Sequence, residues 1–168
     1  MSVPALIKKG NLVHQFGTWG PDFTLAFELR INSPTSEISP TAWYNLFHFT
    51  ANDRDCCEYG DRLPSVYLRK STVNANGWQF HTSIRMPPLK TGSLSEMVIG
   101  QWHKIKLAWK ENEKKDEAIF TETIDGKVLE SWKTEPTQYH NVKWYQSNPW
   151  YPSAGNLVNL QNFTIEHY

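Results

Sequence analysis

The sequence predicts an all-β fold, a two-sheet antiparallel β-sandwich, and three observations carry this prediction. Residues 22–31 alternate strictly between apolar and polar side chains. The stretch 102–109 does the same, with its apolar face on the odd-numbered positions. A period of two is typical of a strand with one buried face. Between two β-prone runs stands Asp125-Gly126, which favours a type I′ hairpin turn because both central residues of that turn need positive φ.

Turn residues divide the chain into short strands. The cluster 17–21 separates the first apolar runs from the alternating stretch. Residues 43–50 are apolar on both parities, which indicates a central strand, and residues 156–166 show the same feature, which indicates a β-bulge. Pro87-Pro88 ends a hairpin, and 91–99 is expected to be an irregular connection. The expected strands are 6–7, 12–13, 22–31, 43–50, 66–68, 78–84, 102–109, 118–124, 127–132, 142–145 and 156–166.

Several of these strands carry a resemblance to a known family. Gly100-Gln101-Trp102-His103 followed by alternation is similar to a G-x-W-H strand, and Ile124-Asp125-Gly126 is similar to the hairpin that follows it. Residues 23–30, 45–49 and 157–166 resemble three further strands of the same pattern. The family is the laminin G-like branch of the concanavalin A-like jelly rolls. The resemblance implies one jelly-roll domain over residues 1–168, but this fold hosts lectins, adhesion modules, glycosidases and lyases alike.

Composition excludes some classes of partner. The 168 residues include 17 Lys plus Arg and 17 Asp plus Glu, so the formal charge is zero, which argues against nucleic acid or an anionic membrane surface. No apolar run is long enough for a membrane span. The first residues, Met1-Ser2-Val3, lack the shape of a signal peptide. Of the two remaining settings, the cytoplasm and the extracellular space, we expect the second, as a secreted domain or part of a larger ectodomain.

The long polar loop 51–63 is the first candidate site. Oxygen-rich loops suit Ca²⁺, which takes six to eight oxygen ligands, and the resemblance implies a calcium ion at the sandwich rim. The competing interpretation is a solvated loop in which Arg54 and Arg62 neutralise the neighbouring carboxylates. Because a loop of this length in a compact domain is usually functional, we expect it in the binding face with or without a metal. The candidate calcium ligands are Asp53, Asp55, Glu58 and Asp61.

The same loop contains the chain's two cysteines, Cys56 and Cys57, which are adjacent. Adjacent cysteines cannot close a long loop, so the fold does not depend on disulfides. Three states stay open: two reduced thiols, a vicinal disulfide, or pairing with another chain.

The aromatic stretch 144–151 is the second candidate site. Exposed aromatic rings stack on sugars, amides read hydroxyl groups, and the prolines of this loop lower the ordering cost of binding. The alternative is that Trp144 and Trp150 close the end of the sandwich. The candidate ligand-binding residues of the two loops are Trp144, Tyr145, Asn148, Trp150, Tyr151, Arg54 and Arg62.

Catalytic signatures are weak. The paired carboxylates of jelly-roll glycosidases have no counterpart in spacing here. Phe27-Glu28-Leu29-Arg30 and Gln79-Phe80-His81 faintly resemble two motifs of jelly-roll alginate lyases, although Ala26 stands where the leading arginine belongs. We therefore expect a non-catalytic binding module, lectin-like or adhesive, for a glycan or an extracellular protein, with calcium as the candidate cofactor. The alternatives are a polysaccharide lyase or glycoside hydrolase, and a self-assembling module that forms homo-oligomers.

Overall fold

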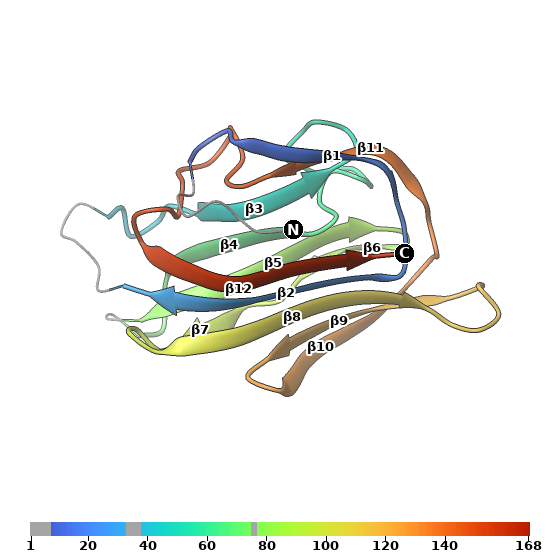
Figure 1. Ribbon diagram of the computed structural model, residues 1–168. Coiled ribbons are helices and arrows are strands. Elements are labelled where there is room, and N and C mark those ends of the chain that lie inside the picture. Colours follow the sequence, from blue (N-terminus) through green and yellow to red (C-terminus); the bar gives the residue numbers. More distant parts are fainter. Residues whose placement is uncertain (1–7, 33–37, 75–76) are drawn as a thin grey trace.

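The structure is a computed structural model, and it describes residues 8–32, 38–74 and 77–168. Within these ranges the chain forms twelve β-strands and no helix (Figure 1). The strands are β1 (Leu12–Trp19), β2 (Phe23–Ile31), β3 (Tyr44–Thr50), β4 (Ser65–Lys70), β5 (Trp78–Met86), β6 (Leu89–Gly92), β7 (Ser95–Met97), β8 (Trp102–Glu111), β9 (Ala118–Ile124), β10 (Lys127–Thr134), β11 (Tyr139–Tyr145) and β12 (Val158–His167).

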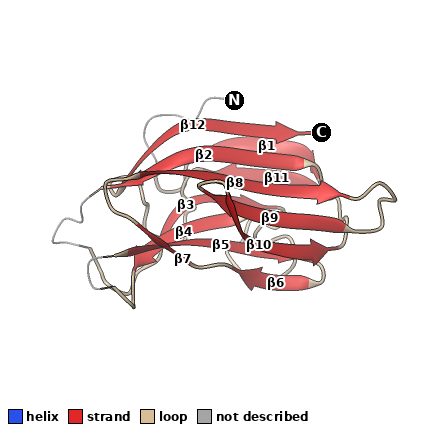
Figure 2. Ribbon diagram, turned by 90° about the horizontal axis from the view of Figure 1, so that it is seen from below, coloured by secondary structure: helices blue, strands red, loops and turns tan. Residues whose placement is uncertain are grey.

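The described strands form two antiparallel sheets that pack face to face (Figures 1 and 2). The larger sheet has the order β1-β11-β3-β4-β5-β6, and β7 also pairs with β5. The smaller sheet has the order β10-β9-β8-β2-β12. This arrangement confirms the predicted all-β, two-sheet sandwich. No helix of the described chain has the length and apolarity needed to cross a membrane.

The core lies between the sheets, as the alternating patterns predict. Every odd-numbered residue of β2, from Phe23 to Ile31, is buried, and β8 buries its odd-numbered residues from His103 to Trp109 in the same way. Four tryptophans are completely buried with them: Trp19, Trp78, Trp109 and Trp144. The large aromatic content of the sequence therefore serves mainly to fill the interior.

Two local predictions are also confirmed. Asp125 and Gly126 have φ values of 52° and 80°, as the turn between β9 and β10 requires. The Asp125 carboxylate accepts a hydrogen bond from the backbone N–H of Lys104 at 2.8 Å and contacts His103 Nδ1 at 2.7 Å. The β12 register against β2 shifts between Gln161 and Thr164, which is the predicted bulge.

Three strand predictions need comment. β1 extends to Trp19, into the residues predicted as the turn cluster 17–21, because it pairs with β11 along its length. The connection predicted as irregular, 91–99, contains the end of β6 and all of β7, and both strands pair with β5. In each case pairing to a neighbouring strand outweighs a weak local pattern. The strand predicted at 6–7 lies outside the described residues.

The outer face of the larger sheet carries polar side chains. Val66 and Leu68 of β4 point into the core, so Ser65 and Tyr67 point outward. On β5 the outward residues are Gln79, His81 and Ser83. The 51–63 loop packs onto this face: the Arg54 carbonyl is 3.2 Å from His48 Nε2, and Arg62 Nη1 donates to Ser83 Oγ at 3.0 Å.

Candidate functional site

A pocket of about 180 Å³ opens on the outer face of the larger sheet. It is lined by Trp43, Arg62, Tyr67, His81 and Tyr151. Trp43 precedes β3, Tyr67 and His81 are directly paired on β4 and β5, and the other two residues come from the loops before β4 and after β11. Five separate segments of the chain therefore meet at one place.

Asp55 connects three of the lining side chains. Its Oδ1 lies 3.2 Å from Arg62 Nη2 and accepts a hydrogen bond from the Tyr67 hydroxyl at 3.2 Å. Its Oδ2 accepts a hydrogen bond from the Tyr151 hydroxyl at 3.0 Å. Its backbone carbonyl accepts a further hydrogen bond from Arg62 Nε at 2.9 Å. The pocket is thus pre-formed by one carboxylate whose three partners come from different segments.

Arg62 is largely buried and is held by several hydrogen bonds. Only 10% of its side chain is exposed, and three of its five N–H groups form the contacts with Asp55 and Ser83. Its guanidinium carbon lies 5.2 Å from the centre of the Tyr67 ring. Burial raises the pKa of the Tyr67 hydroxyl well above its usual range, and the pKa of Tyr151 is raised by burial and by Asp55. Both phenols are therefore neutral at physiological pH.

His81 presents a neutral imidazole to the pocket. Its Nδ1 is hydrogen-bonded to the Ser93 carbonyl, which assigns the proton to Nδ1 and leaves Nε2 as an acceptor. No group in the described chain is hydrogen-bonded to Nε2. Burial, followed by the Ser93 contact and the nearby guanidinium groups, sets the pKa of His81, and the net effect lowers it to about 4. His81 is consequently an acceptor, or a base, at neutral pH.

Trp43 supplies an aromatic wall. Its ring centre lies 4.9 Å from that of His81 and 6.1 Å from that of Tyr67. Arg69 of β4 stacks on it, with its guanidinium carbon 4.6 Å from the ring centre, and donates from Nε to Gln79 Oε1 at 2.8 Å. An aromatic ring flanked by a cation is a common platform for a ligand that combines apolar and polar surface.

A second aromatic group adjoins the pocket. Trp150 is 39% exposed, and its ring centre lies 5.3 Å from that of His48 and 6.1 Å from that of Tyr145. The Tyr145 hydroxyl donates to Asp53 at 2.6 Å. Burial lowers the pKa of His48 to about 4, so the ring under Trp150 is neutral as well.

The structure brings the two predicted loops together. Asp53 and Asp55 of the 51–63 loop contact Tyr145 and Tyr151 of the aromatic stretch. Arg62 and Tyr151 line the pocket, whereas Trp150, which precedes Tyr151 in the chain, contacts Tyr145 and is not part of the lining. Arg54 does not line it: its side chain is 57% exposed and lies 3.6 Å from Asp61.

Two of the predicted ligand-binding residues have structural positions instead. Trp144 faces inward on β11, is completely buried, and stacks on Phe49 and Phe163. Asn148 is also completely buried, and its side-chain oxygen accepts hydrogen bonds from the backbone N–H groups of Trp150 and Tyr151 at 3.2 and 3.0 Å. Neither side chain is exposed to a ligand, which corrects the prediction for both. Trp144 is buried because alternate residues of β11 face the core. Asn148 is buried because its side chain forms the hydrogen bonds of the turn that follows β11.

The four predicted calcium ligands do not converge. Asp53 pairs with Lys143 at 2.5 Å, and Glu58 pairs with Lys90 at 3.1 Å. Asp61 is completely buried and accepts hydrogen bonds from Asn52 Nδ2 and from the Glu58 backbone N–H. Across residues 8–32, 38–74 and 77–168 there is no group of three or more His, Cys, Asp or Glu side chains placed to hold a metal ion. These carboxylates are engaged with other groups of the described chain, and calcium stays a prediction.

Cys56 and Cys57 are joined to each other by a disulfide, and the peptide bond between them is cis. Of the three states that the sequence leaves open, the structure has the vicinal disulfide. The described chain contains no free cysteine for pairing with another chain. The disulfide directly follows Asp55, so it lies in the backbone that positions the pocket's connecting carboxylate.

Sequence reasoning did not select Trp43 or Tyr67, and it considered His81 only for its resemblance to a lyase motif. A usable signal was present on β4 and β5. Their apolar residues share one parity, and the opposite parity carries large side chains that can hydrogen-bond. Such side chains on the solvent parity of adjacent strands indicate a functional sheet face.

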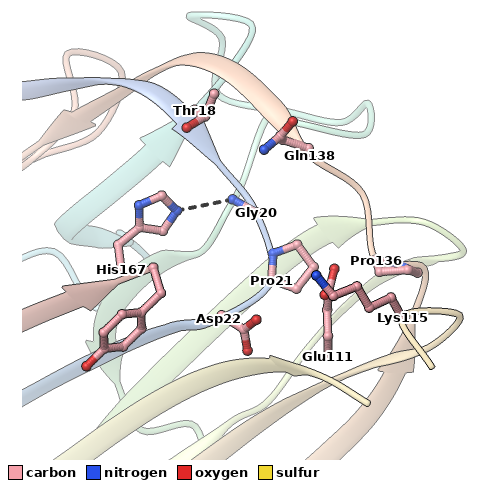
Figure 3. A pocket seen from close by; sticks show the side chains of 10 residues that line it. Thr18, Gly20, Pro21, Asp22, Glu111, Lys115, Pro136, Gln138 and His167 are labelled. Carbon is pink, nitrogen blue, oxygen red and sulfur yellow. Dashed lines mark hydrogen bonds between the residues drawn. The ribbon is translucent and has the colours of Figure 1, made fainter. Parts of the chain in front are cut away.

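A second pocket, of about 340 Å³, is lined by Asp22, Glu111, Lys115, Gln138 and His167 among others. Figure 3 shows these side chains arriving from separate elements, with one hydrogen bond, from the Gly20 N–H to His167 Nε2, at 3.4 Å. No network comparable to that of Asp55 fixes its lining within the described residues. We therefore place the candidate site at the pocket beside Asp55.

No protein-family model matches the sequence, and no curated protein matches it. Among solved structures, the chain is similar to a legume lectin-like domain from Entamoeba histolytica, with 10% sequence identity and a TM-score of 0.43 over 95% of this chain and 88% of that one. It is similar to the same degree, 10% identity and a TM-score of 0.43, to the receptor-binding domain of botulinum neurotoxin type G, over 85% of this chain. The match spans 34% of the toxin chain.

Proposed function

We propose that this protein is a non-catalytic saccharide-binding module whose site is the pocket lined by Trp43, Arg62, Tyr67, His81 and Tyr151. The observation that carries the proposal is the pre-formed lining: Asp55 holds a guanidinium and two phenols in fixed positions beside an aromatic wall. The volume, about 180 Å³, is below the ~300–1,000 Å³ typical of drug-sized ligands. It suits one sugar ring, with the rest of a chain lying along the sheet face.

Each lining group has a role in this proposal. The apolar face of a sugar ring packs on Trp43 or Tyr151. Arg62 donates to sugar oxygens. The two phenol oxygens, whose protons are donated to Asp55, accept from sugar hydroxyls, and Nε2 of His81 accepts from a further hydroxyl. Because Asp55 orders these side chains before binding, little conformational entropy is lost when the ligand enters. The disulfide supports an extracellular setting, since disulfides persist in oxidising compartments.

Calorimetric titration with a panel of neutral and anionic oligosaccharides tests this proposal. We expect one class to bind and Trp43→Ala to weaken its binding at least tenfold, which corresponds to about 1.4 kcal/mol. Tyr168→Ala is the matched control, because Tyr168 is an exposed aromatic outside this pocket. If the folded protein binds no saccharide, the site would have to serve a protein ligand instead.

One observation favours a second candidate function, a uronate-specific polysaccharide lyase. The Gln79-Phe80-His81 segment places a neutral imidazole with an unpaired Nε2 beside two tyrosines and Arg62. In such a reaction the proton on C5 of a uronate passes to Nε2 of His81, and its electron pair forms a C4–C5 double bond. The C4–O bond breaks, and Tyr67 or Tyr151 passes to the departing oxygen the hydroxyl proton that it otherwise donates to Asp55, which leaves a phenolate. Arg62 would stabilise the carboxylate during this step.

Formation of the unsaturated product, followed by its ultraviolet absorbance, tests the lyase directly. A lyase would produce it from a uronate polymer, and His81→Ala would abolish production even at saturating polymer. A protein that binds the same polymer but never yields the product would be the binding module of the first proposal.

A further inference from the structure

We infer that the sugar unit recognised by this pocket is anionic, carrying a carboxylate or a sulfate group. This inference rests on the proposed function and names the ligand class for the same site. It comes from the arginines on the outer face of the larger sheet and from the partners that they have and lack.

Arg69 has no ion partner in the described part of the chain. Its only hydrogen bond is from Nε to Gln79, so the four N–H groups of its two terminal nitrogens are unoccupied. The guanidinium lies against Trp43, which lines the pocket. A cation held in place by an aromatic ring, with unoccupied donors, is prepared to bind an external anion.

Arg85 of β5 is the second arginine without an ion partner among the described residues. Its Nη1 donates to the Ile84 and Thr91 carbonyls at 2.8 and 3.3 Å, and its Nε is buried with no hydrogen-bond partner. The nearby carboxylates are already engaged. Asp55 accepts from Arg62 and two tyrosines, and Glu96 accepts from Gln79 and Ser71. Arg69 and Arg85 therefore form no direct ion pair within the described chain, and the carboxylate nearest in the hydrogen-bond network, Glu96, reaches Arg69 only through Gln79.

The guanidinium group also gives chemical selectivity. Its planar set of donors matches the two oxygens of a carboxylate or two oxygens of a sulfate, whereas a neutral hydroxyl can use one donor at a time. Arg62 lies inside the pocket, where three of its N–H groups bind Asp55 and Ser83 and the guanidinium adjoins the Tyr151 hydroxyl, and Arg69 offers four N–H groups from beside Trp43. A sugar ring between them would place an acidic substituent within the field of both cations.

The experiment compares three oligosaccharides of equal length by calorimetry at low and high salt: an oligouronate, a sulfated neutral oligosaccharide, and the same neutral oligosaccharide without sulfate. We expect at least one anionic form to bind ten times more tightly than the neutral one, with a difference that shrinks at high salt. Comparison of the oligouronate with the sulfated form identifies which group is recognised.

Arg69→Gln should remove most of this preference, and Arg69→Lys should restore part of it. Arg54→Gln is the matched control, because Arg54 lies on the same face but outside the pocket. Equal binding of neutral and anionic forms would overturn the inference while leaving the proposed function intact. Binding of none of the three would overturn the proposed function as well.

Discussion

Among single residues, Asp55 does most to fix the lining of the pocket, because its carboxylate binds three of the five lining side chains. The sequence offers Asp53, Asp55, Glu58 and Asp61 as equivalent acids in one loop, and nothing in their spacing separates them. In the structure only Asp55 accepts hydrogen bonds from residues that line the pocket. The difference arises from contacts between segments far apart in the chain, which local sequence cannot encode. Tyr151, for example, is 96 positions from Asp55.

Asp55→Asn should therefore weaken both folding and binding. It removes the negative charge beside Arg62, whose side chain is 10% exposed, and we expect a loss of about 1–3 kcal/mol in the free energy of unfolding. Saccharide affinity should fall because Tyr67 and Tyr151 lose their common anchor. Denaturant unfolding and calorimetry measure the two effects. Glu58→Gln, which alters an exposed pair with Lys90, should cost less than about 1 kcal/mol, and an equal loss in both variants would contradict the role given to Asp55.

Histidines whose pKa is lowered by burial, His48 and His81 foremost, predict a pH dependence of stability. His48 and His81 have pKa values lowered from 6.5 to about 4, so between these values the unfolded chain binds more protons than the folded one. Their contribution is complete above pH 6.5 and is lost as the pH falls toward 4. For the fully buried His48 the loss between pH 6.5 and 5 is about 2 kcal/mol. Urea unfolding at pH 7 and pH 5 checks this, and equal stability at the two values would show that these rings are not held neutral.

Among the elements, the 51–63 loop contributes most to the pocket, since it supplies Arg62 to the lining and Asp55 to the hydrogen bonds that hold it. The length and polarity of the loop predict that it belongs to the binding face, and the structure places it on the outer face of the larger sheet, against His48 and Ser83. Calcium was predicted from the acid content of the loop and from the resemblance to laminin G-like domains. In the structure these carboxylates have other partners: Asp53 pairs with Lys143 and Glu58 with Lys90, both from outside the loop, and Asp55 pairs with Arg62 of the loop itself.

Reduction of the disulfide tests the loop as an element. Cys57 is exposed, so a thiol reductant can reach the disulfide. Breaking the Cys56–Cys57 bond removes a constraint on the backbone next to Asp55. We expect reduced protein to bind saccharide several-fold more weakly while its far-ultraviolet circular dichroism stays that of a β-sandwich, since the core does not involve these residues. A variant with Cys56→Ser and Cys57→Ser should bind with the same affinity before and after the reductant. Unchanged binding by the reduced wild-type protein would remove the disulfide from the account.

The end of β6 tests how closely the sheet positions His81. A Cβ atom at Gly92 would lie 2.7 Å from His81 Cε1 and would also collide with the Thr82 carbonyl. Gly92→Ala should therefore displace the His81 ring and lower saccharide affinity. Gly17→Ala on β1 is the control, because a Cβ there meets nothing within 4 Å. If both variants bind like the wild type, His81 has no part in recognition.

At the scale of the whole molecule, the fold could be predicted because it depends on periodicity. Alternation in β2 and β8 and the Asp125-Gly126 turn are local features, and each determines which face is buried. The binding surface depends instead on which strands are neighbours. β4 and β5 follow each other in sequence. β3 and β11 are far apart in sequence, yet they pair, and this pairing brings Tyr145 and the 146–151 turn to the 51–63 loop. No local pattern specifies that pairing.

The central claim is that the outer face of the larger sheet, at the pocket beside Asp55, is the binding surface. The most direct measurement is a two-dimensional NMR titration of the labelled protein with an oligouronate, following backbone amides and tryptophan indoles. The account predicts shifts concentrated at Trp43, Arg62, Tyr67, His81 and Tyr151, with the buried Trp78 indole unmoved. Shifts centred on the smaller sheet, or on the pocket of Asp22 and His167, would contradict it.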